Sequence, residues 1–580
     1  MLLLIFSWLL RSIFAIPRLL LAQRNNGQAP VDPASRNAQI DGGPVEKTLS
    51  RNPDGPAVIS MFQPADSLKD LVPLVEGRNE WLTLTYTQLH RAAVRLAMGL
   101  LAHGTQPNST MVMLIPNGGE YTVLLWTCVL LRFAYVSLDP AMLEASEFPT
   151  LKKLIRTLKP QLIVAPDRIQ GKALDFAIAE LQLAQPIRIS LSQSDGPSEW
   201  KCLADWATGA EKSPIEEASL IAAARYDDPE RIHSILFTSG TSGLPKGCPR
   251  PVRGMSHLLQ SQSWLIDAKV GALAVQQAHN SRGIAPAQTL QTWRAGGAVV
   301  LTGQSFSVRD AASAIRQIGA TFLVLTPPMV HEMATELAER PLDVRSVRRI
   351  QVGGDTITRG LLTKCAAMFP HAQICVNHGM TEGGGAFRWP FFDTPVSQLP
   401  YFGVMCPVGT IAPGAVMRVW DTIRQSVAST GQLGELHLAC ASHIRHYLGG
   451  RSEEDFYHDG TRRWFKTGDI ARIDADGRVF ILGREKDMIQ RARTTVVPVP
   501  HPAFGADPFA VISSYSARTE AGIKDHVEAV LGPDYALGGV VSLKQLGLVG
   551  FPVNLTRKII RSEVQQAVLE LLHKRSTKIN

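Results

Sequence analysis

The feature that most constrains the fold is a repeated alternation of short apolar runs and amphipathic segments between about residues 45 and 409. Apolar residues at positions 89, 93, 96, 97, 100 and 101 follow the spacing of one helix face, and Gly104 ends that pattern. Such alternation predicts an α/β fold with mostly parallel sheets. We expect strands at 111–115, 135–138, 162–165, 235–237, 298–301, 322–325, 350–352 and 374–376, and a buried helix at 121–131.

Beyond about residue 409 the pattern changes to short alternating segments separated by turn signals. Antiparallel strands are expected at 416–419, 434–438, 465–473 and 479–482, with a turn at Asp476-Gly477. The last hundred or so residues have the pattern of a smaller α+β unit. A chain of 580 residues, 45% hydrophobic and 19% charged, is long enough for several domains and excludes wholesale disorder.

The N-terminal segment differs in composition from the rest of the chain. Residues 1–24 are mostly apolar, and the positive charges of Arg11 and Arg18 follow the first apolar run, whereas a secretory signal carries its charge ahead of that run. An interfacial anchor helix on a membrane surface, an organellar presequence and a cleaved or artefactual start all remain open. Residues 25–44 have the composition of a linker. No uninterrupted apolar stretch is long enough for a polytopic membrane protein.

Charge and cysteine content exclude further classes. The net charge of +8 is a small excess without a long basic block, which favours anionic small ligands and not nucleic acid. Seven cysteines without a Cys-x-x-Cys pair are typical of a reducing compartment, and they argue against a disulfide framework or a structural zinc site. We therefore expect an intracellular protein, cytoplasmic or organellar, that is not secreted.

The most informative segment is the loop that follows the expected strand at 235–237. It combines glycines, which let backbone N–H groups approach an anion, with hydroxyl groups and one lysine. That combination predicts a polyphosphate cradle, although the order of residues is not that of the P-loop. The predicted phosphate-binding residues are Thr238, Ser239, Gly240, Thr241, Ser242, Gly243 and Lys246.

This loop, residues 238–247, resembles the signature of the adenylate-forming superfamily, which includes acyl-CoA synthetases and aryl-CoA ligases. Other segments resemble further motifs of that family in the family's order, over about residues 45–575. They are Leu-Thr-Tyr-Thr-Gln-Leu at 84–89, Phe-Ala-Tyr-Val-Ser-Leu-Asp-Pro at 133–140, Asn-His-Gly-Met-Thr-Glu at 377–382, Gly-Glu-Leu at 434–436, Trp-Phe-Lys-Thr-Gly-Asp at 464–469, Gly-Arg-Glu-Lys-Asp-Met-Ile at 483–489 and Pro-Val-Asn-Leu-Thr-Arg-Lys at 552–558.

The resemblance implies activation of a carboxylic acid by ATP, giving acyl-AMP and pyrophosphate with Mg²⁺, followed by transfer to the thiol of CoA. Because this reaction brings negative charges together, it requires cations, N–H donors and a metal-holding acid. Thr381 is expected to contact the α-phosphate, and Glu382 to hold Mg²⁺ among phosphate oxygens. Lys558 is expected to neutralise charge at the reacting carboxylate.

Nucleotide and acyl contacts are implied in the same way. Asp469 and Arg484 are expected to bind the ribose, and His378 takes the place of an aromatic residue that stacks on adenine. His279 corresponds to a gate residue of the acyl pocket, and Gly383 and Gly384 leave little bulk at one wall of that pocket. Lys486 corresponds to the hinge of a mobile C-terminal domain. The adenine-side residues are Gly353, Gly354, Asp355, Asn377, His378 and Gly379.

The resemblance weakens in the C-terminal domain. After Gln490 the chain reads Arg-Ala-Arg-Thr-Thr-Val-Val-Pro, where the family carries a glycine-rich segment and a helix, and Arg557 replaces a usual glycine. The expected division is an AMP-binding domain at 45–482 and a shortened lid domain at 483–580. Two alternatives stay open: an adenylation enzyme that delivers acyl-AMP to a carrier-protein pantetheine, and a nucleotide-binding pseudoenzyme.

Overall fold

The computed structural model describes residues 52–576 with internal gaps. The gaps are 73–79, 193–197, 239–244, 267–271, 277, 451–452, 485–489, 492–493, 502–504, 514–519, 532–536 and 553–558.

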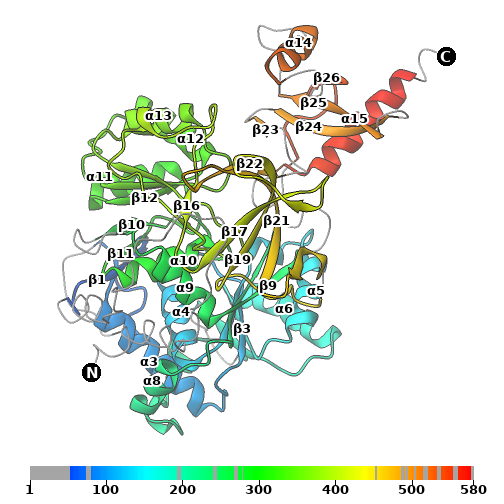
Figure 1. Cartoon of the computed structure of the whole chain (residues 1–580). Helices are drawn as coiled ribbons and strands as arrows, with labels where there is room; N and C mark the ends of the chain where they lie inside the picture. Colours follow the sequence, from blue (N-terminus) through cyan, green and yellow to red (C-terminus); the bar gives the residue numbers. More distant parts are fainter. Residues whose placement is uncertain are drawn as a thin grey trace. The chain divides into compact units, whose positions relative to one another are not determined.

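The chain divides into two compact units. The larger contains the residues up to Thr238, Lys246–Thr467 and Ala471–Ile481, and the smaller contains Ser239–Pro245, Gly468–Ile470 and the residues from Leu482 onward. The predicted α/β fold with several sheets is confirmed (Figure 1).

The first seven-stranded sheet has the order β14-β13-β12-β10-β11-β1-β2 and is parallel except for its last pair. Its strands are short and apolar because both faces are covered, as in other parallel sheets. The strands are β1 (Pro56–Pro64), β2 (Trp81–Thr85), β10 (Leu273–Val275), β11 (Ala298–Leu301), β12 (Phe322–Leu325), β13 (Arg349–Val352) and β14 (Gln373–Val376).

The second seven-stranded sheet has the order β7-β6-β5-β3-β4-β8-β9 and ends in the antiparallel pair β8–β9. That pair carries the glycine-rich loop between its strands. The strands are β3 (Thr110–Met113), β4 (Ala134–Ser137), β5 (Leu162–Ala165), β6 (Ile187–Ser190), β7 (Lys201–Cys202), β8 (Ile232–Phe237) and β9 (Gly247–Pro251).

Helices connect the parallel strands. Helix α3 (Tyr86–Ala102) begins with a capping box between Thr85 and Gln88 and ends before Gly104, whose φ of +87° suits a glycine. Figure 1 shows α11, α12 and α13 beside the strands that they connect. The others are α4 (Gly119–Leu131), α5 (Phe148–Leu158), α6 (Arg168–Glu180), α7 (Leu203–Trp206), α8 (Glu217–Arg225), α9 (Val252–Ser261), α10 (Ile284–Arg294), α11 (Val308–Ile318), α12 (Pro327–Glu339) and α13 (Arg359–Met368).

An antiparallel sheet follows, in the order β15-β16-β22-β21-β19-β17-β18, with β20 paired to β21. The predicted turn between its strands β21 and β22 is present, and Gly477 has a φ of +73°. The strands are β15 (Phe387–Arg388), β16 (Gly409–Ile411), β17 (Ala415–Asp421), β18 (Ser426–Val427), β19 (Leu433–Cys440), β20 (Phe456–His458), β21 (Arg463–Ile473) and β22 (Arg478–Arg484).

The smaller unit contains a four-stranded sheet in the order β23-β24-β25-β26 and two helices. The stretch in which the family pattern breaks forms strands here, because β24 pairs with β25 along its whole length. A compact core of valines and Leu543 holds α15 on this sheet. The elements are β23 (Gln490–Arg491), β24 (Thr494–His501), β25 (Gly505–Ile512), β26 (Gly539–Ser542), α14 (Glu520–Leu531) and α15 (Arg561–Ser576).

Within the described ranges, no helix combines the length and the apolar character that crossing a bilayer requires. Residues 1–24, the predicted anchor or targeting segment, lie outside those ranges.

Candidate active site

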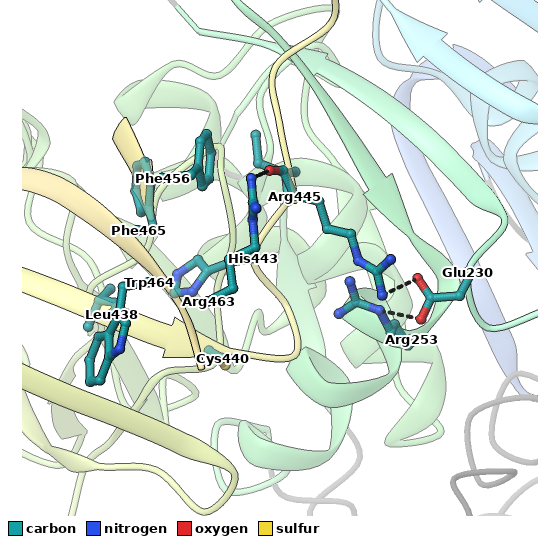
Figure 2. Close-up of a pocket in the computed structure, with 11 residues that line it drawn as sticks. Glu230, Arg253, Leu438, Cys440, His443, Arg445, Phe456, Arg463, Trp464 and Phe465 are labelled. Carbon is teal, nitrogen blue, oxygen red and sulfur yellow. Dashed lines mark hydrogen bonds and ion pairs between the residues drawn. The ribbon is translucent and has the colours of Figure 1, made fainter. Parts of the chain in front are cut away.

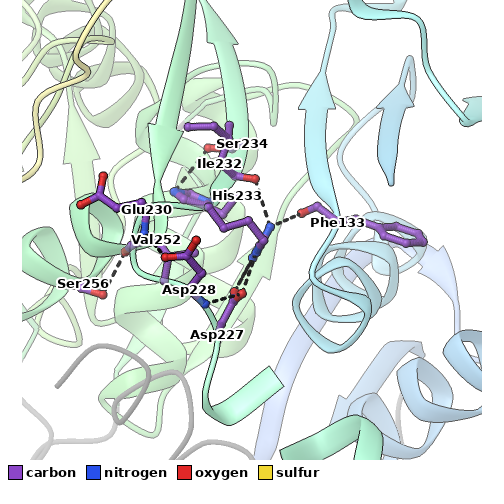
Figure 3. A network of polar contacts seen from close by, with 10 residues as sticks. Phe133, Asp227, Asp228, Glu230, Ile232, His233, Ser234, Val252 and Ser256 are labelled. Atoms are coloured by element: carbon purple, nitrogen blue, oxygen red, sulfur yellow. Dashed lines mark hydrogen bonds and ion pairs between the residues drawn. The ribbon is translucent and has the colours of Figure 1, made fainter. Parts of the chain in front are cut away.

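The strand that leads into the glycine-rich loop is fixed at its start by a buried ion pair. The Arg231 guanidinium donates to both carboxylate oxygens of Asp227, at 2.6–2.9 Å, and to the carbonyl oxygen of Phe133, at 3.3 Å (Figure 3). Asp227 is 6% exposed, so this pair is shielded from solvent. The ion pair therefore anchors β8 to the neighbouring strand β4 before the loop begins.

The two described ends of the loop face each other. The Lys246 N–H donates to the Thr238 hydroxyl at 3.2 Å, and the Thr238 N–H donates to the Lys246 carbonyl at 3.0 Å. The Lys246 ammonium lies 3.1 Å from a carboxylate oxygen of Asp455 and 4.7 Å from the centre of the Tyr447 ring. The predicted phosphate-binding residues Ser239, Gly240, Thr241, Ser242 and Gly243 lie outside the described residues.

Glu382 is held by the same tyrosine. The Tyr447 hydroxyl donates to Glu382 Oε1 at 2.7 Å, and the Ile444 N–H donates to the Glu382 carbonyl oxygen at 2.9 Å. Burial, followed by the nearby Glu382 charge, raises the pKa of Tyr447, so the phenol keeps its proton and remains a donor. Tyr447 thus joins Lys246 and Glu382, which are 136 positions apart in the sequence.

Two further predicted segments lie at the carboxyl ends of adjacent parallel strands. Val352 of β13 pairs with Val376 of β14, so Gly353–Asp355 and Asn377–Glu382 leave the sheet side by side. A Cβ atom on Gly353 would lie 2.3 Å from the Asn377 carbonyl oxygen, so only glycine fits there. This edge of an open sheet is where α/β proteins bind ligands.

The remaining adenine-side residues surround this edge. Gly354 has a φ of +91° and, like Asp355, is exposed, while the Asn377 amide oxygen accepts a hydrogen bond from Gln262 at 2.9 Å. His378 packs edge-on against Phe387, with ring centres 5.4 Å apart. Gly379 is exposed and Thr381 is partly buried.

The glycines after Glu382 are surrounded by close neighbours. A Cβ atom on Gly383 would lie 2.4 Å from the His443 ring, and one on Gly384 would lie 2.8 Å from Leu258. Gly385 has a φ of +76°. His443 and Leu258 therefore pack directly against these two glycines, and the assignment of Gly383 and Gly384 to a wall of the acyl pocket stays a prediction.

His279, the predicted gate residue, lies in a loop that is tied to the end of β3. Its Nδ1 is 2.9 Å from the Ser281 hydroxyl, and the next residue, Asn280, donates to the carbonyl oxygens of Ile115 and Pro116. Burial lowers the pKa of His279, so its imidazole is neutral at pH 7.

The remaining predicted residues belong to the C-terminal half. Asp469 is 5% exposed on β21, and Arg484 is the last residue of β22, although its side chain is not described. Lys486 and Lys558 lie outside the described residues. Sequence reasoning missed Tyr447 and Asp455; Tyr447 lies eleven residues after the Gly434-Glu-Leu436 segment, but nothing in the sequence pairs it with Glu382.

Comparison with known proteins matches this chain to enzymes of one family. The family model described as AMP-binding enzyme matches residues 45–448. An acyl–CoA ligase of Pestalotiopsis microspora is 43% identical over 92% of this chain and 99% of its own length. A fatty acid–[acyl-carrier-protein] ligase of Streptomyces coeruleorubidus is 28% identical over 73% of this chain and 76% of its own length.

Among solved structures, ATP-bound MatB from Rhodopseudomonas palustris has the same fold. Its TM-score is 0.69 at 19% identity, over 90% of this chain and 98% of that one. On the family model and the 43% identical relative, the chain belongs to the AMP-binding enzyme family, as the order of its motifs predicts.

Proposed function

We propose that this chain is an acyl-CoA ligase that works through an acyl-AMP intermediate. A carboxylate oxygen of the substrate attacks the α-phosphorus of ATP, a new acyl–phosphate bond forms, and pyrophosphate leaves. The CoA thiol then displaces AMP to form the thioester. The 43% identical acyl–CoA ligase, matched over almost its whole length, supports this assignment.

The observation that carries the proposal is the Lys246–Tyr447–Glu382 arrangement. The Lys246 ammonium contacts the ring of Tyr447, and the Tyr447 hydroxyl donates to the buried Glu382 carboxylate, at the carboxyl edge of the parallel strands. Lys246 is paired with Asp455, and phosphate oxygens of ATP would replace Asp455 as the partner of the ammonium. The Lys246 ammonium is thus paired with Asp455 before ATP binds and with phosphate after it binds, so its charge always has a partner.

Glu382 fits a role as the protein ligand of Mg²⁺. Magnesium in nucleotide sites is usually bound by one or two carboxylates together with substrate phosphates. In the part of the chain that the structure describes, no group of three or more His, Cys, Asp or Glu residues gathers to form a metal cage. Phosphate oxygens and water would supply the other ligands. Bound Mg²⁺ would neutralise phosphate charge, and Tyr447 would hold the Glu382 carboxylate in orientation.

The other residues take the roles that the family motifs assign. Thr238 and the loop residues after it would bind the β- and γ-phosphates, and Thr381 the α-phosphate. Gly353–Asp355 and Asn377–Gly379, with His378 stacked on the ring, would form the adenine side. Asp469 and Arg484 would bind the ribose, and His279 would line the acyl pocket.

Lys558 would neutralise charge at the reacting carboxylate. We assign residues 45–482 to the adenylating domain and 483–580 to a lid that moves about Lys486. Movement of the lid would bring Lys558 to the substrate, although Lys558 lies far along the sequence from the phosphate loop.

A carrier-protein pantetheine is the second candidate for the acyl acceptor. It is favoured by the 28% identical relative whose name specifies an acyl-carrier-protein. Attachment to a membrane surface through residues 1–24 is a separate proposal. Sedimentation of the full chain with anionic vesicles tests it, since a chain lacking residues 1–24 would then stay in the supernatant.

The test of the main function is pyrophosphate release with a panel of carboxylic acids, with and without CoA, together with a thioester assay. Pyrophosphate and acyl-CoA formed with at least one acid are the expected result. Pyrophosphate without thioester would transfer the assignment to a carrier protein as acceptor. ATP binding without pyrophosphate release for any acid would contradict the proposal and indicate a pseudoenzyme.

A further inference from the structure

The larger unit contains a cavity of about 360 Å³ beside the candidate active site. It is lined by the start of α9, the end of β19 and strands β20 and β21 (Figure 2). Its volume is within the range of small-molecule sites in proteins. The residues that concern its chemistry are Glu230, Arg253, Cys440, His443, Arg445 and Arg463.

The charge of this cavity favours an anion. Arg253 and Arg445 share the single carboxylate of Glu230, at 2.8 and 3.1 Å. The Arg463 guanidinium lies 5.2 Å from the Phe456 ring centre and donates to the Arg445 carbonyl oxygen. Three arginines and a single acidic residue, Glu230, therefore line the cavity, and the excess positive charge raises the local concentration of anions.

A buried histidine offers unused hydrogen-bonding capacity at the cavity wall. His443 is 6% exposed, and neither of its ring nitrogens has a hydrogen-bond partner among the described residues. Burial lowers the pKa of His443 to about 3, so the ring is neutral at pH 7 and has one N–H donor and one acceptor nitrogen. Buried polar groups are normally paired, so this residue of the cavity wall has hydrogen-bonding capacity that the described residues leave unused.

Cys440 differs from the other cysteines. All seven lie in the described part of the chain, and six of them are buried, whereas Cys440 is partly exposed and lines the cavity. Its Sγ lies 3.1 Å from the Ser442 hydroxyl. Burial raises the pKa of the Cys365 and Cys406 thiols to about 12. Burial acts in the same direction on Cys440 and is the largest single cause, but the hydrogen bond and charge of His257 together with hydrogen bonds from Ser442 outweigh it, so the pKa is lowered.

We propose that Cys440 is a site of reversible modification by anionic low-molecular-weight disulfides, which the arginines of this cavity bind. The Cys440 thiolate attacks one sulfur of the disulfide, whose S–S bond breaks as the mixed disulfide forms. The other half leaves as a thiolate and takes up the proton that the Cys440 thiol released. The disulfide itself is the oxidant. Exposure and thiolate character together select this cysteine over the other six.

Modification would reach the candidate active site through two contacts. His257 donates from Nε2 to the carbonyl oxygen of Gly385, which ends the segment that begins at Thr381. The His443 ring packs so closely against Gly383 that a Cβ atom on this glycine would lie 2.4 Å from it. A group attached to Cys440 would displace one or both histidines and lower adenylation. This effect rests on the proposed function, whereas formation of the adduct does not.

The test treats the full chain with glutathione disulfide and follows its intact mass, with peptide mapping of the adduct. We expect one glutathionyl group, located on Cys440 and removed by dithiothreitol. Cys440→Ser should prevent the adduct, and the matched control Cys406→Ser, a change at a buried cysteine, should not. No adduct, or equal modification of another cysteine in the wild-type chain, would overturn the proposal, and mapping of the wild type needs no variant to fold.

Charge selectivity is tested with cystamine, a cationic disulfide. Glutathione disulfide should react at least about tenfold faster than cystamine, on the scale of electrostatic steering. Arg445→Gln should slow only the reaction with glutathione disulfide. Equal rates for the two disulfides would overturn the role of the arginines.

Pyrophosphate release before and after treatment measures the effect on adenylation. Unchanged release would overturn the link to Gly385. If no acid supports release even from the untreated chain, the proposed function fails while the mass result still stands.

Discussion

The two units of this protein differ in how they hold the residues assigned to catalysis. In the larger unit, Glu382 is buried, receives a hydrogen bond from Tyr447, and follows strand β14, whose last three residues are also buried. In the smaller unit, the sheet and α15 share a core of seven buried residues, six of them valines. A small core contributes less stability, so the smaller unit should be the weaker one. Glu382 is therefore held in place within the larger unit, whereas Lys558, which we propose as the catalytic lysine, lies outside the described residues.

The largest expected effect is that of Lys558→Ala. Loss of a charge-stabilising group should lower acyl-AMP formation about 10²- to 10³-fold, measured as pyrophosphate release. Lys544→Ala, a change at an exposed lysine of the same unit, is the matched control and should leave the rate unchanged. Equal rates for Lys558→Ala and wild type would remove Lys558 from the mechanism.

The second prediction tests the difference in stability between the units. Leu543 belongs to the core of the smaller unit and Leu323 to β12 of the larger one. Each change to Ala should cost about 2–5 kcal/mol through the cavity that it leaves. In calorimetry we expect Leu543→Ala to lower only the first of two transitions and Leu323→Ala to lower the second. A single transition that both variants shift equally would show that the two units unfold together.

The third prediction concerns the tyrosine between Lys246 and Glu382. Tyr447→Phe removes a donor from a buried carboxylate, which should cost about 1–3 kcal/mol in the free energy of unfolding and lower pyrophosphate release. Tyr457→Phe is the matched control, because Tyr457 hydrogen-bonds to His437 and Arg418 away from Glu382. That variant should lose stability and keep its activity. Equal loss of activity in both would mean that Tyr447 acts only through folding.

The smallest effect is expected from Asp455→Asn. The pair with Lys246 is about one-third exposed on each side, so its loss should change the free energy of unfolding by at most about 1 kcal/mol. Because the ammonium no longer has to exchange a carboxylate for phosphate, the KM for ATP should fall. A raised KM would instead make Asp455 a residue that positions the lysine.

Much of the larger unit follows from local sequence patterns. The strands expected at 298–301 and 322–325 have those bounds in β11 and β12, because short apolar runs between helices are typical of buried parallel strands. The antiparallel strands after residue 409 were predicted within a few residues, as was the turn at Asp476-Gly477. Strand β1 was not predicted, and neither was the β24–β25 pairing, whose strands contain prolines.

The sequence by itself determined the alternation of strands and helices in most of the larger unit, the family and the residue types of a nucleotide site. Those properties depend on periodicity and on motifs within a few residues of one another. Only the tertiary structure decided that Tyr447 joins Lys246 to Glu382, that Asp455 neutralises the lysine and that His443 fills the space beside Gly383. Lys246 and Asp455 lie 209 positions apart, and pairs so distant are set by how the sheets pack rather than by any local pattern.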